Sequence, residues 1–467
     1  MSLRPVSRAV SVVAVLLIPP AALAAPGDPI GPAVAVNAAI AANLGQEDTD
    51  IALTPDGRSV IVWNDKLTSN GQFLRILGRR VAANGTPQGA EFRIDSGILA
   101  ANHPRVGIDA AGNFVVVWQQ STEADQSSRP ITGRVFMRRY NASGTPLSAP
   151  ILVDSTPIEG HEQFNPSISM NAQGQFVIAW NSYHRTMRQQ FWELSEGPVL
   201  ARRFMADGTP LGATQLVADR TSGSLLVSQG AGLVRPGGAL QLLFATQGPS
   251  VALRPDGSFV VAWTSGSMAV AITDSFIHYI RAPLGLQSVK AQGFDSAGNK
   301  QGRPSEAAAL VSWNDPLFET PDVALTPDGG YALAWSQYNR LRGEGIKRGI
   351  FLRRYDAAGK AVGSAVEVMR DAGSPTVYDP SQAPSIAVDA NGNMTVVATA
   401  ARSFASNGSP LGPTRPTCQG TTSTFIISAP RLDLHANGDY QLACAARVSV
   451  GTSGVENVVL SQRFDGP

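Results

Sequence analysis

The sequence has little charge and almost no net charge, which argues against several classes of partner. Charged residues make up 16% of the 467 residues, and 37 Lys and Arg balance 36 Asp and Glu. Such a chain has no field that would recruit a polyanion, so we expect no nucleic-acid partner. It also lacks a nucleophile elbow, a phosphate loop, a zinc-protease helix motif and a paired-cysteine motif, and its five histidines are not spaced as metal ligands. We therefore expect no metal and no cofactor.

Long apolar runs are missing beyond the N-terminus. Arg4 and Arg8 precede an uncharged stretch over residues 9–25 that contains an Ala-Leu-Ala sequence. This is the layout of a secretory signal peptide with cleavage after Ala24. A membrane anchor is the alternative, but Pro19 interrupts a run that is already shorter than the about 20 residues of a spanning helix. We predict an exported mature chain that is secreted, periplasmic or at the cell surface, with no membrane span.

Cysteine is scarce, because the chain contains only Cys418 and Cys444. Export places both in an oxidising compartment, where a disulfide persists. We predict one disulfide between them, and the alternative is two buried thiols.

The chain is rich in Gly and Pro, with 46 and 32 residues, and it contains one hairpin that recurs. In the clearest copy, Val251 and Leu253 alternate with small or polar residues, Asp256-Gly257 forms a tight turn, and an apolar run follows. A repeat of this kind decides the fold, so it has to be found before single motifs are weighed. The seven copies cover residues 51–63, 104–118, 166–180, 249–263, 321–335, 384–398 and 431–444.

A second hairpin follows most copies, often with an Arg-Arg pair before its glycine turn. In the first repeat, residues 76–81 lead through Asn84-Gly85 into residues 91–95. Each repeat therefore has four antiparallel strands, A to D in chain order, and seven such units predict an all-β fold, a seven-bladed β-propeller. After the signal peptide, residues 1–24, we expect residues 25–467 to form this single domain.

The two ends of the chain predict how the ring closes. The last repeat stops at a C strand, residues 458–464, with no D strand after it. Residues 29–37 resemble the segment that enters the D strand of the first repeat, residues 87–95. We predict that this N-terminal strand completes the seventh blade and removes its open edge.

The repeats differ mainly in the B–C and D–A connections, which lie on one face of a propeller, and we predict that this variable face is the binding surface. The sixth repeat leaves two arrangements open. In one, residues 404–412 include its C–D turn and its C strand is displaced. In the other, residues 401–421 form a loop and a later strand uses residues 424–428. The second arrangement would bring Cys418 near Cys444, which stands where other repeats have Trp.

Three repeated features suggest a function but favour a structural interpretation. Tryptophan ends five B strands, where it could stack on sugars but is better explained by packing between blades. The Arg-Arg pairs could bind a carboxylated ligand, yet adjacent strand residues point to opposite faces, so we expect them to bridge blades or to cover the adjacent aromatic residue with their aliphatic stems. The turns that begin at Asp109, Asp295 and Asp389 lack the ligand series of a calcium loop. The tryptophans are Trp63, Trp118, Trp180, Trp263 and Trp335, and the pairs are residues 79–80, 138–139, 202–203 and 353–354.

Candidate ligand-binding residues are charged, histidine or aromatic residues in the connections of the variable face. Trp192 and Trp313 fall outside the repeated tryptophan position, which makes them the stronger aromatic candidates. For the other clusters a solvated loop is the favoured alternative, and no residue is predicted to be catalytic. The candidates are His161, Glu162, His184, Arg185, Arg188, Trp192, Glu193, Trp313, Tyr338, Arg340 and Arg342.

With both hairpins laid out, the chain resembles repeats of secreted and cell-surface bacterial proteins. The shared pattern is Pro-x-Val-Ala-x-x-x-Asp-Gly-x-Phe-Val-Val-x-Trp followed by Arg-Phe-Asp-x-x-Gly, and it covers nearly all of the mature chain. The resemblance implies an exported protein with no assigned chemistry. Such repeats often occur in calcium-dependent proteins, but this chain lacks the glycine- and aspartate-rich nonapeptides that accompany them. Sialidase Asp-box repeats are a looser likeness, because their serine and threonine positions differ.

Our leading prediction is an exported, non-catalytic protein that binds a glycan or an envelope protein through its variable face. The alternative is a propeller hydrolase or lyase that acts on polysaccharide. Such an enzyme needs two converging carboxylates, or a carboxylate with a basic partner, near the central channel. A second alternative is a structural spacer of the cell envelope.

Overall fold

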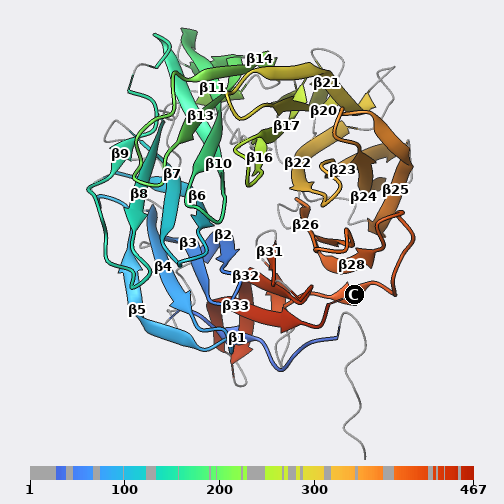
Figure 1. Ribbon diagram of the computed structural model, residues 1–467. Coiled ribbons are helices and arrows are strands. Elements are labelled where there is room, and N and C mark those ends of the chain that lie inside the picture. Colours follow the sequence, from blue (N-terminus) through green and yellow to red (C-terminus); the bar gives the residue numbers. More distant parts are fainter. Residues whose placement is uncertain are drawn as a thin grey trace, which may run out of the picture.

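Seven antiparallel β-sheets stand around one axis in the computed structural model of the protein (Figure 1). The prediction of an all-β, seven-bladed β-propeller is confirmed. The described residues contain no helix with the length and apolar character needed to cross a membrane. The structure describes residues 28–37, 46–66, 74–97, 99–121, 133–155, 157–188, 191–195, 197–221, 225–228, 248–265, 268–271, 280–283, 288–309, 317–341, 345–371, 383–418, 424–426, 430–435, 437–450 and 454–466.

Each blade has four main strands, which follow one another from the axis outward as A, B, C and D. Blade 1 consists of β2 (Gln46–Leu53), β3 (Ser59–Lys66), β4 (Leu74–Val81) and β5 (Pro87–Arg93), and blade 2 of β6 (Ala101–Ile108), β7 (Phe114–Gln120), β8 (Arg134–Tyr140) and β9 (Ile151–Leu152). Blade 3 consists of β10 (His161–Met170), β11 (Phe176–Arg188), β13 (Gly197–Phe204) and β14 (Gln215–Thr221), and blade 4 of β16 (Ser250–Leu253), β17 (Phe259–Ser265), β20 (Ser288–Phe294) and β21 (Lys300–Ala309). Blade 5 consists of β22 (Leu317–Leu325), β23 (Tyr331–Leu341), β24 (Gly345–Tyr355) and β25 (Ala361–Asp371). Blade 6 consists of β26 (Ser385–Val388), β27 (Met394–Val397), β28 (Ala400–Phe404) and β29 (Arg415–Pro416). Blade 7 consists of β31 (Arg431–Leu434), β32 (Tyr440–Val450), β33 (Gly454–Phe464) and β1 (Val34–Ala35).

The B strands form the core because each lies in the middle of a sheet and between neighbouring blades. All residues of β7 are buried, for example. The five B-strand tryptophans are each at most 3% exposed, and Trp118 shares a core cluster with Val60 and Val62 of the preceding blade. The interpretation of these tryptophans as packing residues is confirmed. Truncation of one to Ala would cost roughly 3–5 kcal/mol of stability.

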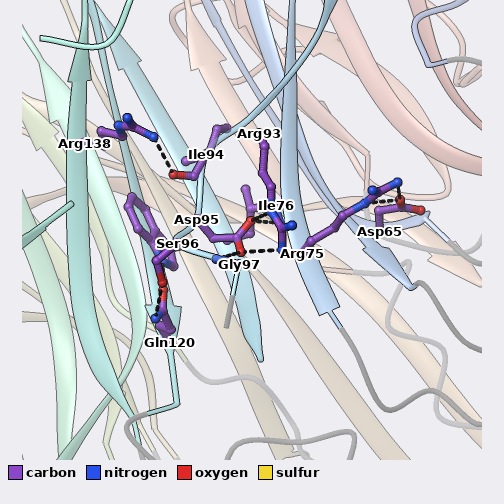
Figure 2. A network of polar contacts seen from close by, with 11 residues as sticks. Asp65, Arg75, Ile76, Arg93, Ile94, Asp95, Ser96, Gly97, Gln120 and Arg138 are labelled. Atoms are coloured by element: carbon purple, nitrogen blue, oxygen red, sulfur yellow. Dashed lines mark hydrogen bonds and ion pairs between the residues drawn. The ribbon is translucent and has the colours of Figure 1, made fainter. Parts of the chain in front are cut away.

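The Arg-Arg pairs bridge neighbouring blades, as predicted. The first arginine reaches back: Arg138 Nη1 donates to the Ile94 carbonyl of blade 1 at 3.3 Å (Figure 2). The second reaches forward: Arg80 Nη1 donates to the Ala142 carbonyl in the C–D turn of blade 2 at 3.2 Å. Because successive strand residues point to opposite faces, one pair serves two blade junctions.

Blade 1 also shows how carboxylates outside the channel are used (Figure 2). The Asp95 carboxylate accepts hydrogen bonds from the N–H groups of Ile76 and Gly97, both at 2.9 Å. Asp65, whose side chain is fully buried, pairs with Arg75 at 2.5 Å. These carboxylates hold strand ends and are saturated by protein donors, so they have a structural role.

The N-terminal segment completes blade 7, because β1 pairs antiparallel with β33. The Val36 N–H donates to the Val459 carbonyl at 2.7 Å, and the Val459 N–H donates to Asn37 Oδ1 at 2.6 Å. Asn37 thus accepts a backbone N–H from β33, the C strand of blade 7, just as Asp95 accepts the Ile76 N–H from the C strand of blade 1. The ring is closed by chain segments from the two ends of the sequence.

Blade 6 has its C–D turn within residues 404–412, as in the first arrangement considered above, but its C strand is not displaced, because β28 pairs directly with β27. The loop of the second arrangement is wrong, whereas the later strand that it predicts exists as β30 (Thr424–Ile426) and pairs with β32 of blade 7. Cys418 and Cys444 nevertheless form the predicted disulfide. Both cysteines are fully buried in the core cluster between blades 6 and 7, where Cys444 occupies the position that Trp has in other blades.

The variable face carries the additional strands. β12 (Phe191–Ser195), in the B–C connection of blade 3, pairs with β15 (Leu225–Ser228), in the connection that leads to blade 4. β18 (Met268–Ala271) and β19 (Ile280–Pro283) form a hairpin in the B–C connection of blade 4. The pairing of β12 with β15 places the B–C and D–A connections on one face, as predicted.

Candidate functional site

The candidate site lies where the innermost strands begin, at the variable-face end of the propeller axis that these strands encircle (Figure 1). The region around this axis is called the channel, as is usual for a propeller. In blades 1, 2, 3 and 5, the A strand has a bulge at this end. The backbone φ is positive at this place in three blades, with 49° at Asp48, 51° at His103 and 52° at Asn165. Such backbone is uncommon for residues with a side chain and clusters at functional sites.

Asp48 and His103 form a pair between blades 1 and 2. His103 Nδ1 lies 3.2 Å from Asp48 Oδ2, and Asn64 Nδ2 donates to the same oxygen at 3.2 Å. The Asp48 side chain is 33% exposed and the His103 side chain 16%, so solvent reaches both. Because Nδ1 is held by the carboxylate, Nε2 is the ring nitrogen left to exchange a proton with a ligand.

Two residues further along the A strands, seven residues at equivalent positions, one from each blade, form a ring around the axis. Most of them accept a hydrogen bond from the next blade: the Val106 N–H donates to Asp50 Oδ2 at 2.8 Å, and the Ile386 N–H donates to Asp322 Oδ2 at 2.9 Å. The serines of blades 3, 4 and 6 accept in the same way. From blade 1 to blade 7, the ring contains Asp50, Arg105, Ser167, Ser250, Asp322, Ser385 and Arg431.

Arg105 and Arg431 depart from this structural rule. A guanidinium has N–H donors and no acceptor, so it cannot receive the N–H of the next blade. In blade 7 the acceptor is instead Asp433, which lies two residues deeper and receives the Leu53 N–H at 2.8 Å. Within the described ranges, neither guanidinium forms an ion pair with a carboxylate at 4.0 Å or less. Among the residues that the structure describes, the two arginines therefore have N–H donors that no protein group accepts.

The carboxylates of the channel have pKa values shifted in opposite directions. Burial raises the pKa of Asp48, but the charge and hydrogen bond of His103, together with the charge of Arg105, outweigh burial and hold this pKa well below its usual range. Burial dominates at Asp50 and Asp433, and it raises the pKa of Asp433 to about 6. Neighbouring carboxylates with divergent pKa values are what acid–base catalysis uses.

Two of the predicted candidates, His161 and Glu162, begin β10 and hold blade 3 to blade 2. The Gly133 N–H donates to Glu162 Oε2 at 2.8 Å, and Arg134 Nη1 lies 3.3 Å from the same oxygen. His161 Nδ1 lies 3.1 Å from Ser182 Oγ. These contacts are structural, and a role in ligand binding stays a prediction.

The other predicted candidates lie on strands of the variable face or outside the described residues. The end of β11 pairs with β12, and the end of β23 pairs with the start of β24. A role of any of these residues in ligand binding stays a prediction. Those on strands are His184, Arg185, Arg188, Trp192, Glu193, Tyr338 and Arg340, whereas Trp313 and Arg342 lie outside the described residues.

The prediction from sequence places function in connections that do not repeat, so it misses a cluster that lies inside the repeat. A signal was present in the pattern Pro-x-Val-Ala, because x is the ring position. Across the copies x is Asp or Ser, which can accept a hydrogen bond, except at Arg105 and Arg431. The residue before this pattern is Asp48, His103 or Asn165 in the first three blades.

A separate cavity of about 450 Å³ lies between blades 5 and 6. Blade 6 has Ala398 at the position of the tryptophan and turns at once into β28, which leaves this space open. Glu367 and Arg370 line the cavity and pair with each other at 2.6 Å. Their charges are therefore mutually neutralised, unlike those of the channel arginines.

Comparison with known proteins shows no family, since no family model and no curated protein match the sequence. Similar solved structures include the GH93 α-L-arabinofuranosidase of Fusarium graminearum with arabinobiose, at 10% identity over 93% of this chain and 98% of that chain, with a TM-score of 0.44. They also include the α-L-arabinanase of Penicillium chrysogenum with arabinobiose (14%, 78% and 92%, 0.42) and a PL25 ulvan lyase (11%, 94% and 94%, 0.43). This likeness assigns no residue and no substrate to this chain.

The leading prediction, a non-catalytic protein that binds a glycan or an envelope protein, is contradicted. Several of the similar structures are named as arabinofuranosidases, arabinanases or a polysaccharide lyase, which are enzymes that process glycans. Moreover, the channel contains a carboxylate with a basic partner, Asp48 with His103, which is what the alternative prediction of a hydrolase or lyase requires.

Proposed function

We propose that the protein is an exported enzyme that cleaves glycosidic bonds in a polysaccharide, as a hydrolase or a lyase, and that its active site is the channel mouth at blades 1 and 2. The observation that carries the proposal is the solvent-accessible Asp48–His103 pair, in which both residues have left-handed backbone. Each such residue costs of order 1–3 kcal/mol and persists where the surrounding structure maintains it. Asn165 has the same backbone at the equivalent bulge of blade 3, so the proposal rests on the charged pair that blades 1 and 2 place at this bulge and not on the bulge itself.

The pair can supply the acid–base chemistry that both reactions need. Asp48 has a lowered pKa, so it is ionised at neutral pH and holds His103 with Nδ1 toward it. His103 Nε2 is then free to take a proton from the substrate or from a water molecule and to return it to the leaving oxygen. Asp433, with a pKa of about 6, is a second group in the channel that exchanges a proton near neutral pH.

Release of reducing ends from a panel of neutral and acidic polysaccharides tests the proposal, and we expect the wild-type protein to cleave at least one polymer. Asp48→Asn and His103→Asn are the sharpest variants, because Asn tolerates positive φ and stands at the equivalent place in blade 3 as Asn165. Loss of the acid–base pair should lower the rate by about 100-fold or more.

The matched control is Asp356→Asn. Asp356 accepts the Lys360 N–H at 2.8 Å in the exposed C–D turn of blade 5, on the face opposite the channel mouth, so this variant should keep the wild-type rate. Circular dichroism of each variant confirms that it folds. Absence of cleavage across the panel, or wild-type rates in both channel variants, contradicts the proposal.

Export is the second part of the proposal. It is supported by the signal-peptide layout of the first 24 residues and by the buried Cys418–Cys444 disulfide, which suits an oxidising compartment. Mass spectrometry of the protein from fractionated cells should find a mature chain that begins at Ala25 outside the cytoplasm. A cytoplasmic chain that retains Met1 contradicts export.

A further inference from the structure

The channel contains two arginines at positions that serve a structural purpose in the other blades. We propose that Arg105 and Arg431 bind carboxylate groups of the substrate, so that the polysaccharide is built from acidic sugars such as uronic acids. This inference rests on the proposed function and names its substrate class.

The first step of the argument is the position of the two arginines. They lie on the A strands of blades 2 and 7, which flank blade 1, and both occupy the ring position. At five of the seven ring positions an Asp or Ser accepts the N–H of the next blade, so the repeat provides a structural residue here by default. An arginine at this position gives up that bond, and a gain elsewhere has to explain the exchange.

The second step is the charge around the two guanidiniums. Burial and the nearby charge of Arg431 lower the pKa of Arg105, while the charges of Asp50, Asp48 and Asp322 act in the opposite direction, so the two cations disfavour each other within a partly compensated cluster. The nearest ring carboxylate, Asp50, already accepts the Val106 N–H at 2.8 Å. An anion placed between two like charges relieves their repulsion, which makes this a natural position for a bound carboxylate.

The third step is hydrogen bonding. Arg105 Nη1 donates to the Pro104 carbonyl at 2.7 Å, which uses one of the five N–H donors of the guanidinium. Asp48, the other nearby carboxylate, is bound to His103 and Asn64 at 3.2 Å each. A planar guanidinium with unused donors matches a carboxylate in a two-bond geometry, which a neutral sugar hydroxyl cannot reproduce.

The fourth step is distance along the strand. The arginines lie two residues deeper than the His103 position, which corresponds to about 6–7 Å of extended strand. One sugar residue spans such a distance, so a carboxylate held by the arginines leaves the glycosidic bond of that residue near His103. Serines in blades 3, 4 and 6 keep the other part of the ring small. The channel therefore has a charged side with both arginines and the reactive pair, whereas the rest of the ring has three serines and Asp322.

Polygalacturonate and alginate, before and after carbodiimide–borohydride reduction of their carboxylates, are the probes. Binding is measured by affinity electrophoresis in gels that contain each polymer, and cleavage by release of reducing ends. We expect at least one native polymer to be bound and cleaved at least 10-fold better than its reduced form. Arg105→Gln and Arg431→Gln should lose this preference, whereas Arg254→Gln should keep it, because Arg254 lies at the opposite end of an inner strand and donates to the Gly329 carbonyl at 2.7 Å.

The outcomes separate the substrate class from the proposed function. Equal binding and cleavage of native and reduced polymers, cleavage of neutral glycans alone, or no binding of either native polymer overturns the acidic substrate. Arginine-dependent binding of a native polymer without cleavage of any polymer supports carboxylate recognition and overturns the enzymatic function. Retention of the preference in both arginine variants overturns the roles of Arg105 and Arg431.

Discussion

Individual residues of the channel carry the functional signal because they depart from what the same position does in other blades. At the bulge where blade 3 has the uncharged Asn165, blades 1 and 2 have Asp48 and His103, and Arg105 replaces a hydrogen-bond acceptor with a donor. By contrast, the departure at Cys444 is compensated within the core, since its disulfide with Cys418 fills the position of a tryptophan. A departure without structural compensation is the one that points to a ligand.

Asp433 allows a test of channel electrostatics through the pH dependence of stability. Burial raises its pKa from 3.8 to about 6, and the charge of Asp50 adds to the effect. A carboxyl whose folded pKa exceeds its unfolded pKa stabilises the fold fully below the unfolded value, and this contribution is lost as the pH rises through the folded value. Wild-type protein should therefore lose stability, relative to a variant without this carboxyl, between about pH 4 and pH 7.

Asp433→Asn keeps an oxygen that can accept the Leu53 N–H but does not ionise. We expect its free energy of unfolding, relative to wild type, to rise by about 1–3 kcal/mol from pH 4 to pH 7, as measured by urea unfolding at both pH values. A difference that does not change with pH contradicts the raised pKa of Asp433.

At the scale of elements, the blades could be predicted because each hairpin is specified locally. Alternating apolar residues and an Asp-Gly turn define one A–B hairpin without reference to the rest of the chain. The position of β28 in blade 6 was harder to predict from the sequence, because a tight turn between β27 and β28 replaces the usual B–C connection there. The channel site could not be predicted in this way, because it depends on which side of each A strand faces the axis and on which blades are neighbours.

The contribution of β1, the strand that closes the ring, can be tested directly by deletion. Deletion of residues 25–37 removes the fully buried Val36 and the bond from the Val459 N–H to Asn37, and leaves the edge of β33 open. We expect a loss of stability of roughly 3 kcal/mol or more, seen as a lower melting temperature.

Deletion of residues 25–27 alone is the control, because it keeps Asp28, whose carbonyl accepts the Asp465 N–H and makes the first backbone contact among the described residues of the segment. This shorter deletion should melt like the mature chain. If the protein that lacks residues 25–37 also melts like the mature chain, the N-terminal strand does not contribute to closure.

At the scale of the whole molecule, the ring is what assembles the site. Asp48 and Arg431 are far apart in sequence, yet the charge of Arg431 acts on Asp48 because blade 7 lies beside blade 1. The Arg463 Nη1 bond to the Ala83 carbonyl, at 2.9 Å, joins the same two blades near the opposite face. Closure of the propeller thus positions the charged side of the channel, and the function depends on the complete ring rather than on any one blade.

The central claim is that the Asp48–His103 pair at the channel mouth cleaves glycosidic bonds. The most direct test is the initial rate of reducing-end release by wild type and His103→Asn on the polymer that the wild type cleaves fastest. A rate at least about 100-fold lower in the variant, with an unchanged circular dichroism spectrum, is the predicted result. A folded His103→Asn variant that cleaves as fast as the wild type contradicts the account.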